Sequence, residues 1–153
     1  MKVERDITID AAPQEVWDVL MDPACLEDWV SIHRKLKKAP DAPLVEGDEL
    51  TQSLHLAHTN FDVRWTVKEA DAPRKAVWEG HGPVRSKAWV VYELSSDGDS
   101  ATRFHYENEF KAPGGPLGVL IAGRAFQRTR EREADKTLAN LKRLLEGSRD
   151  QST

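Results

Sequence analysis

Most of the chain alternates apolar and polar residues in short runs, the period expected for strands with one buried face. The clearest run places Phe61, Val63 and Trp65 on one face, with polar or charged residues between them. Short connections such as Ala72-Pro73 favour antiparallel neighbours, since a parallel crossover needs a dozen or more residues. The alternation predicts about seven strands, at residues 2–9, 31–38, 49–57, 61–68, 74–80, 86–94 and 102–110.

Three further segments have a helical period. Pro13 and Pro23 each open a short predicted helix, because proline is favoured in the first turn, and Asp22 is a good N-cap for the second. The longest predicted helix runs from Pro116 to Gly147, roughly 45 Å at about 1.5 Å per residue. Its second half is amphipathic, with one apolar line through Ala134, Leu138, Leu141 and Leu145.

These elements together predict an α+β fold. A curved antiparallel sheet wraps the long C-terminal helix, and two short helices follow the first strand. We expect residues 1–147 to form a single domain and residues 148–153 to be a flexible polar tail. The inner line of the long helix crosses Gln127 and either Arg130 or Glu131, so we expect it to face a cavity that is not wholly apolar.

Composition narrows the class of protein. Charged residues make up 31% and apolar residues 39% of 153 positions, a profile typical of a soluble globular chain. The N-terminus has no apolar signal core and no apolar run reaches the ~20 residues that span a bilayer, so we expect a cytoplasmic protein that is not integral to a membrane. A net charge of −4 gives no reason to expect nucleic acid as a partner, and the oligomeric state stays open.

The candidate binding site is a set of rings and amides on the predicted inner face. Bulky rings with an N–H or O–H group suit a pocket for a planar or apolar ligand, although simple core packing also explains them. Amides on that face need a partner or cost roughly 1–3 kcal/mol, unless they lie at strand ends in contact with solvent. The predicted cavity lining is Trp29, Gln52, Leu54, Trp65, Trp78, Val90, Tyr92, Phe104, Tyr106, Asn108, Phe126 and Gln127.

No pattern of residues indicates a metal, a cofactor or a named catalytic group. The five histidines are scattered and lack the spacing of a metal site, although His81 at a strand end could reach a pocket mouth as a base. Cys25 has no basic neighbour in sequence to activate it, and as a single cysteine it cannot form an internal disulfide. We therefore expect no metal and no cofactor, and the sequence names no catalytic residue.

Several motifs add a family resemblance. They are residues 9–20, IDAAPQEVWDVL, followed by Asp22-Pro23, residues 26–29, LEDW, and residues 141–146, LKRLLE. In these motifs and in element order the chain resembles the START-like, or SRPBCC, superfamily, particularly its bacterial polyketide cyclase/dehydrase and lipid-transport branch. The resemblance implies the helix-grip fold shared with the birch-pollen allergen family, with a pocket for hydrophobic small molecules between sheet and long helix.

Three hypotheses for function follow. The first is binding or carrying of a lipid, a polyketide or an aromatic metabolite in that cavity. The second is a polyketide cyclase or dehydratase, in which Tyr106, Asn108 or Gln127 positions a carbonyl and Glu131 or Arg130 supplies charge for proton transfer. The third is a protein-interaction module without a ligand, which predicts a filled core and an exposed apolar patch.

Overall fold

The computed structural model describes residues 2–112 and 123–150, with side chains described as far as Gly147. The elements follow the predicted order. They are β1 (Lys2–Ile9), α1 (Pro13–Leu20), η1 (Pro23–Cys25), α2 (Leu26–Trp29), β2 (His33–Lys38), β3 (Glu49–Leu56), β4 (Thr59–Asp71), β5 (Lys75–His81), η2 (Pro83–Arg85), β6 (Lys87–Asp97), β7 (Ala101–Lys111) and α4 (Arg124–Asp150).

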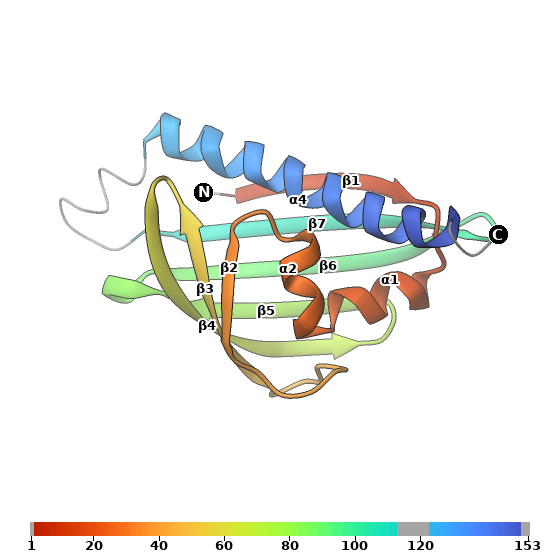
Figure 1. Ribbon diagram of the computed structural model, residues 1–153, viewed down its shortest axis with the longest axis horizontal. Coiled ribbons are helices and arrows are strands. Elements are labelled where there is room, and N and C mark those ends of the chain that lie inside the picture. Colours follow the sequence, from red (N-terminus) through yellow and green to blue (C-terminus); the bar gives the residue numbers. More distant parts are fainter. Residues whose placement is uncertain (1, 113–122, 151–153) are drawn as a thin grey trace.

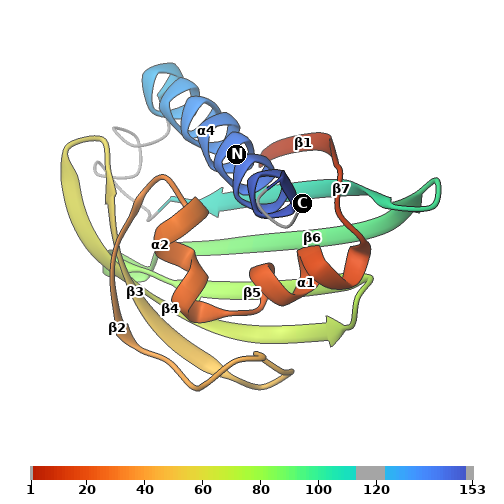
Figure 2. The same ribbon diagram turned by 45° about the vertical axis from the view of Figure 1, so that its right-hand side comes forward.

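All the strands belong to one antiparallel sheet. Its seven strands lie in the order β1-β7-β6-β5-β4-β3-β2. The sheet curves around α4, with α1 and α2 on the same side (Figures 1 and 2). The predicted α+β helix-grip architecture is therefore confirmed. None of the described helices has both the length and the apolar character needed to cross a membrane.

The inner face of the sheet is where the apolar half of each alternating run lies. In β4, Val63, Trp65 and Val67 are buried on the inner face, while Arg64 and Lys68 are exposed on the outer face. The predicted apolar line of the long helix, Ala134 to Leu145, is likewise buried. Because the two apolar surfaces face each other, the sheet and α4 form one core.

Two helix boundaries differ from the prediction. The described helix begins at Arg124, directly after a bend at Gly123, so a single helix running unbroken from Pro116 is wrong; residues 116–122 lie outside the described part. At the other end α4 continues to Asp150, three residues past the predicted end at Gly147. The low helix propensity of glycine accounts for the start of the described helix after Gly123. It does not account for the continuation of the helix through Gly147.

The segment after Asp22 forms a turn of 3₁₀ helix and then a single α turn. The Asp22 carboxylate accepts a hydrogen bond from the backbone N–H of Ala24 at 3.0 Å, the capping role predicted for it. Ser31, just after α2, is tied to α4, since its backbone N–H donates to Thr137 Oγ1 at 3.0 Å and its hydroxyl to Glu133 Oε2 at 2.7 Å. These contacts hold Trp29 against the inner face.

Gly80 makes a close approach that only glycine permits. It lies opposite Trp65 in the β4–β5 ladder, and a Cβ at Gly80 would stand 2.7 Å from the Trp65 ring and 2.8 Å from Val63. Gly80→Ala should therefore lower the free energy of unfolding by about 1–3 kcal/mol, as overpacking does. The same change at Gly147, where nothing lies within 4 Å, should instead stabilise α4 by up to about 1 kcal/mol. Urea unfolding of both variants measures this, and equal effects would contradict the packing role of Gly80.

Candidate ligand-binding interior

Four rings from four adjacent strands form an aromatic ladder on the inner face. The ladder comprises Trp65 of β4, Trp78 of β5, Tyr92 of β6 and Tyr106 of β7, all buried. Successive ring centroids lie 6.1, 5.8 and 6.2 Å apart, within the range of favourable ring contacts. The inner face is therefore a continuous aromatic surface across the centre of the sheet.

Two more rings pack on the ladder at Tyr92. Trp29 of α2 lies 6.0 Å from Tyr92 between centroids, and Phe104 of β7 lies 5.7 Å from it. Since Trp78 contacts the same ring, Tyr92 is the centre of the interior. The strand register produces this arrangement, because Tyr92 pairs directly with Tyr106 and Trp78 with Val90.

Two indole N–H groups in this interior have no hydrogen-bond partner among the described residues. They are Nε1 of Trp29 and Nε1 of Trp78, both buried. A buried donor left unpaired costs roughly 1–3 kcal/mol, and such groups are rare in folded proteins. Both rings flank Tyr92, so the two free donors belong to one region of the interior. An oxygen atom of a bound molecule would satisfy them.

The third inner-face indole is satisfied within the protein. Trp65 Nε1 donates to Gln52 Oε1 at 3.0 Å, and because an indole only donates, this contact fixes the orientation of the amide. Gln52 Nε2 then donates to His33 Nδ1 at 2.8 Å, so His33 is the neutral tautomer with its proton on Nε2. Burial lowers the pKa of His33, which favours that neutral form. The Gln52 amide is occupied by these contacts.

A polar cluster of Asn108, Gln127 and Arg130 lies at the end of the ladder beyond Tyr106. Arg130 Nη2 donates to the backbone oxygen and to Oδ1 of Asn108, at 3.1 and 3.0 Å, and Nη1 donates to Gln127 Oε1 at 3.0 Å. Asn108 Nδ2 donates to Tyr106 Oη at 3.0 Å. The Arg130 guanidinium also lies over the Phe110 ring, 5.6 Å from its centroid. The cluster links a cationic group to a buried phenol through one amide.

The electrostatics of this cluster are set by burial. Arg130 is only 8% exposed, and burial lowers its pKa while the nearby Tyr106 and Glu131 raise it. Burial also raises the pKa of Tyr106, against the opposing effects of Asn108 and Arg130. A phenol with a raised pKa stays protonated near neutral pH and is a hydrogen-bond donor there rather than a base.

The structure brings most of the predicted lining together. Nine of the twelve positions are buried on the inner side: Trp29, Gln52, Leu54, Trp65, Trp78, Val90, Tyr92, Phe104 and Tyr106. Asn108, Phe126 and Gln127 are half-buried, and the Phe126 ring packs on Phe110 at 5.8 Å. Two participants were not predicted, namely His33 as the partner of Gln52 and the fully buried Leu44. Leu44 directly follows Pro43 in a loop with two prolines, and nothing in that stretch of sequence indicated its burial.

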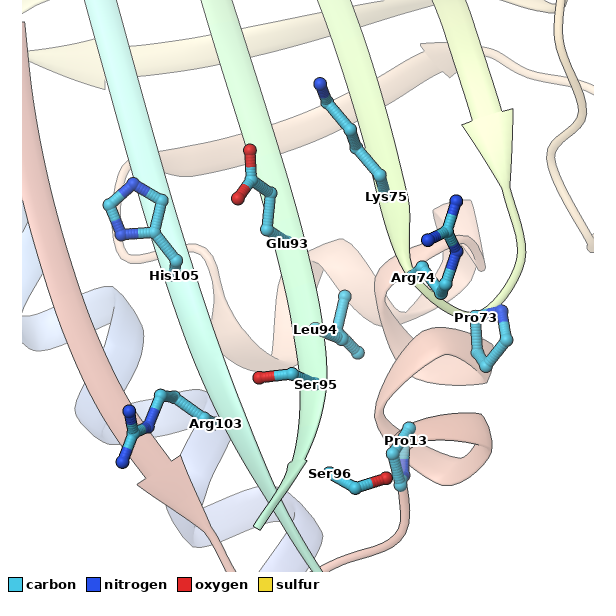
Figure 3. A pocket seen from close by; sticks show the side chains of 10 residues that line it. All are labelled: Pro13, Pro73, Arg74, Lys75, Glu93, Leu94, Ser95, Ser96, Arg103 and His105. Atoms are coloured by element: carbon cyan, nitrogen blue, oxygen red, sulfur yellow. The ribbon is translucent and has the colours of Figure 1, made fainter.

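Two grooves open elsewhere, on the surface. One of about 570 Å³ is lined by side chains such as Lys75, Glu93 and His105, from three neighbouring strands (Figure 3). The other, of about 850 Å³, is lined by residues of β2 to β5 and η2, including Arg34 and Arg64. Neither groove contains a ring of the aromatic ladder.

An ion-pair network lies on the outer face of β1 and β7. Glu4, His105 and Glu107 place side-chain oxygen or nitrogen atoms within 4.8 Å of one another, the one group of metal-ligating type among the described residues. His105 Nδ1 contacts Asp6 at 2.8 Å and its Nε2 contacts Glu107 at 3.0 Å. The Lys2 ammonium lies 3.3 Å from Glu4 and 3.5 Å from Glu107. A cation of the chain itself thus balances these carboxylates.

This network should make stability depend on pH. The hydrogen bond to Glu107, with a further contribution from Asp6, raises the pKa of His105, so its stabilisation is complete below about pH 6.5 and is lost as the pH rises through the raised value. As the pH rises through this range, the free energy of unfolding of the wild type should fall by up to about 1 kcal/mol more than that of His105→Gln. Melting temperatures at pH 6 and pH 8 measure the difference, with His58→Asn as control. Parallel losses in wild type and His105→Gln would refute the assignment.

Comparisons with known proteins agree with this fold. The sequence profile described as polyketide cyclase / dehydrase and lipid transport matches residues 1–146. Two uncharacterized proteins of Mycobacterium tuberculosis, Rv1546 and MT1597, are each 26% identical over 121 residues, covering 78% of this chain and 85% of theirs.

Solved structures with little sequence identity share the architecture. A conserved protein from Geobacillus kaustophilus superposes with a TM-score of 0.77 at 18% identity, covering 97% of both chains. Ara h 8.0201 superposes with a TM-score of 0.68 at 10% identity, covering 96% of this chain and 98% of its own. At these identities the likeness concerns the fold alone.

Proposed function

The chain belongs to the polyketide cyclase / dehydrase and lipid transport family, and we propose that it binds or carries a hydrophobic small molecule between the sheet and α4. Membership confirms the resemblance to the START-like, or SRPBCC, superfamily and supports hydrophobic ligand binding in general. The finer proposal is a lipid, a polyketide or an aromatic metabolite, bound by a single domain of residues 1–147 in the cytoplasm of a bacterium. Of the tail predicted for residues 148–153, residues 148–150 continue α4 instead. Nucleic acid is not among the partners in this proposal.

The observation that carries this proposal is the pair of indole donors Trp29 Nε1 and Trp78 Nε1, neither of which has a partner within residues 2–112 and 123–147. A hydrocarbon between the rings would leave both donors unsatisfied, whereas a carbonyl or hydroxyl oxygen accepts from them. The ligand we propose therefore combines an apolar body with an oxygen near Tyr92. The aromatic ladder supplies the apolar contacts, and the ligand separates rings that touch in its absence.

The proposed lining of the site is the set expected from the sequence, with different roles within it. Trp29 and Trp78 are the donors, and Leu54, Val90 and Phe104 supply apolar surface. Gln52 holds Trp65 in place, since its amide is occupied by that indole and by His33. Asn108 and Gln127 hold Arg130 at the α4 end of the interior.

A cyclase or dehydratase is the second candidate, favoured by the relay from Arg130 through Asn108 to Tyr106. A cationic group coupled to a phenol can stabilise negative charge on a substrate carbonyl oxygen. Such an enzyme also needs a proton acceptor. Burial raises the pKa of both Tyr92 and Tyr106, so these phenols are protonated at neutral pH and do not serve as bases. Binding is therefore the function we place first.

A ligand-free interaction module is the third candidate. It requires an exposed apolar patch of a few hundred Å². Among the described residues the exposed large apolar side chains are Val45 and Val84, from separate loops. Two valines do not provide such a patch, which places this candidate last.

The test compares 2-naphthol with naphthalene, which have the same ring system and differ by one hydroxyl, together with oleate as a lipid. Wild-type protein should bind 2-naphthol about 10-fold more tightly than naphthalene, since a net hydrogen bond is worth about 0.5–1.5 kcal/mol and two donors are available. Trp29→Phe and Trp78→Phe should each reduce that preference, whereas Trp89→Phe, on the outer face, should keep it. Calorimetry and the rise in melting temperature measure binding. No binding of any of the three probes would reject the proposal.

A further inference from the structure

A row of four basic side chains crosses the outer face of the sheet. The strand register pairs Arg64 of β4 with His81 of β5, His81 with Lys87 of β6, and Lys87 with Lys111 of β7. We call Arg64, His81, Lys87 and Lys111 the basic row. Like charges directly opposite each other on neighbouring strands destabilise a sheet. Lys87 and Lys111 form such a pair, and its cost to folding is one that a binding role would explain.

Little in the described part of the chain neutralises this row. Arg64, Lys87 and Lys111 make no ion pair there, and His81 alone has one, with Glu79 at 3.6 Å. Glu79 also contacts Lys68 at 3.7 Å. Along the strands, away from the loops, the next positions on this face are Thr66, Glu79, Trp89 and Glu109. On the other side of Arg64 lies Asp62, which is paired with Lys37 at 2.7 Å. With a net charge of −4 over the whole chain, the row is a local concentration of positive charge.

The loop beside the row presents an apolar and a basic side chain to solvent. It is η2, between β5 and β6, where Val84 is 63% exposed and Arg85 is exposed as well. Both have positive φ, 55° and 61°, an uncommon conformation for residues other than glycine. The conformation holds Val84 away from the core. Basic side chains complement an anionic layer, and an exposed valine complements an apolar layer beneath it. The two together suit a surface that is built of both layers.

The row also lies at the end of the molecule where the polar cluster of the interior is found. Lys111 ends β7, and the adjacent Phe110 packs on Phe126 in the first turns of α4 at 5.8 Å. Figure 1 shows η2 and the start of α4 at the same end of the sheet. Four strands at about 4.8 Å spacing make the row about 15 Å wide, enough to face several lipid headgroups.

From these observations we propose that the basic row and η2 dock the protein on an anionic phospholipid surface. The cations contact lipid phosphates, Val84 enters the interfacial region, and the end of the interior that holds Arg130 faces the bilayer. Nucleic acid fits less well, because it offers no apolar layer for Val84 and because Glu79 and Glu109 flank the row. Docking goes beyond the function proposed above, since it requires no ligand in the interior.

Vesicle flotation tests the proposal with the full chain. Wild-type protein should float with phosphatidylcholine vesicles that contain phosphatidylglycerol and stay behind with phosphatidylcholine alone. Removing three charges, as Arg64→Gln, Lys87→Gln and Lys111→Gln together, should weaken binding by about 100-fold, or about fivefold per charge. The matched control is Arg103→Gln, Lys136→Gln and Arg143→Gln, which should change binding by less than about twofold because these side chains lie outside the row.

A single variant separates binding from structure. Lys111→Glu places a carboxylate opposite Lys87 and should raise the melting temperature by about 1–2 °C while weakening vesicle binding several-fold. Equal losses in the two triple variants, or full binding by Lys111→Glu, would overturn the proposal. Displacement by millimolar inorganic phosphate would indicate a soluble phosphate ligand instead. Tighter binding to a DNA duplex than to the vesicles would indicate nucleic acid, and either result counts against docking.

Discussion

Replacing Phe104 with alanine should lower the free energy of unfolding by about 3–5 kcal/mol, the range for deleting a fully buried ring. Phe104 is 0% exposed and packs edge-on against Tyr92 at 5.7 Å and Tyr106 at 6.4 Å. It lies opposite Ile7 of β1 in the ladder of strands. The ring fills the interior between β1, β7 and the aromatic ladder, so truncation leaves a cavity that rigid strands on both sides cannot collapse.

Urea unfolding followed by circular dichroism measures this loss. Phe61→Ala is the matched control, because the same ring is removed from a half-buried position near the start of β4. Phe61→Ala should lower the free energy of unfolding by about half as much or less, since removing a half-buried ring loses less buried apolar area and leaves a smaller cavity. A loss below about 1 kcal/mol for Phe104→Ala would mean that the interior around Tyr92 is not packed as described.

Arg130→Leu should lower the free energy of unfolding by about 2–4 kcal/mol. The guanidinium donates to both oxygens of Asn108 and to Gln127 Oε1, and removing it leaves these half-buried acceptors without that donor. It also removes the contact over the Phe110 ring. Leucine keeps much of the apolar volume, so the measured loss reports the hydrogen bonds rather than a cavity.

Two further variants separate charge and geometry at this position. Arg130→Lys keeps a positive charge but cannot reach both acceptors with a planar fork, so it should recover less than half of the loss. Arg132→Leu removes an exposed arginine two residues along α4 and should change stability by at most about 0.5 kcal/mol. Equal stability of Arg130→Leu and Arg132→Leu would show that the polar cluster contributes nothing to the fold.

The fold followed from sequence because strand alternation and the apolar line of α4 are local patterns. Each run such as 61–68 buries every second residue, and the burial of Leu138 and Leu141 matches a helical period. The start of α4 was placed wrongly because apolar residues before Gly123 outweighed the low helix propensity of that glycine. Local pattern fixes which residues are buried but not where a helix breaks.

The site was less predictable, because its chemistry depends on contacts between distant segments. Gln52 lies across the β3–β4 pair, where it accepts from Trp65 and also meets His33 of β2. Trp78 has no such partner in the described part of the chain. The β2–β3 register shifts between His33 and Lys35, a bulge that the alternation of β2 does not reveal. Hydrogen-bond satisfaction in the interior therefore could not be predicted from the separate runs.

The basic row could not be predicted for the same reason. Arg64, His81, Lys87 and Lys111 lie in four different runs, and their sequence separations carry no common spacing. Only the register of three strand pairs places them side by side. If the register of any of these strand pairs slipped by one residue, the basic side chain of one strand would lie on the opposite face from that of the other.

In the proposed complex the indoles of Trp29 and Trp78 face a ligand oxygen in the interior. The most direct measurement is the proton–nitrogen NMR spectrum of the five tryptophan indoles during titration with 2-naphthol. The N–H signals of Trp29 and Trp78 should move downfield as they acquire an acceptor, while that of Trp65, already bonded to Gln52, should move least of the three. Movement of the Trp89 signal alone, with those of Trp29 and Trp78 unchanged at saturation, would contradict it.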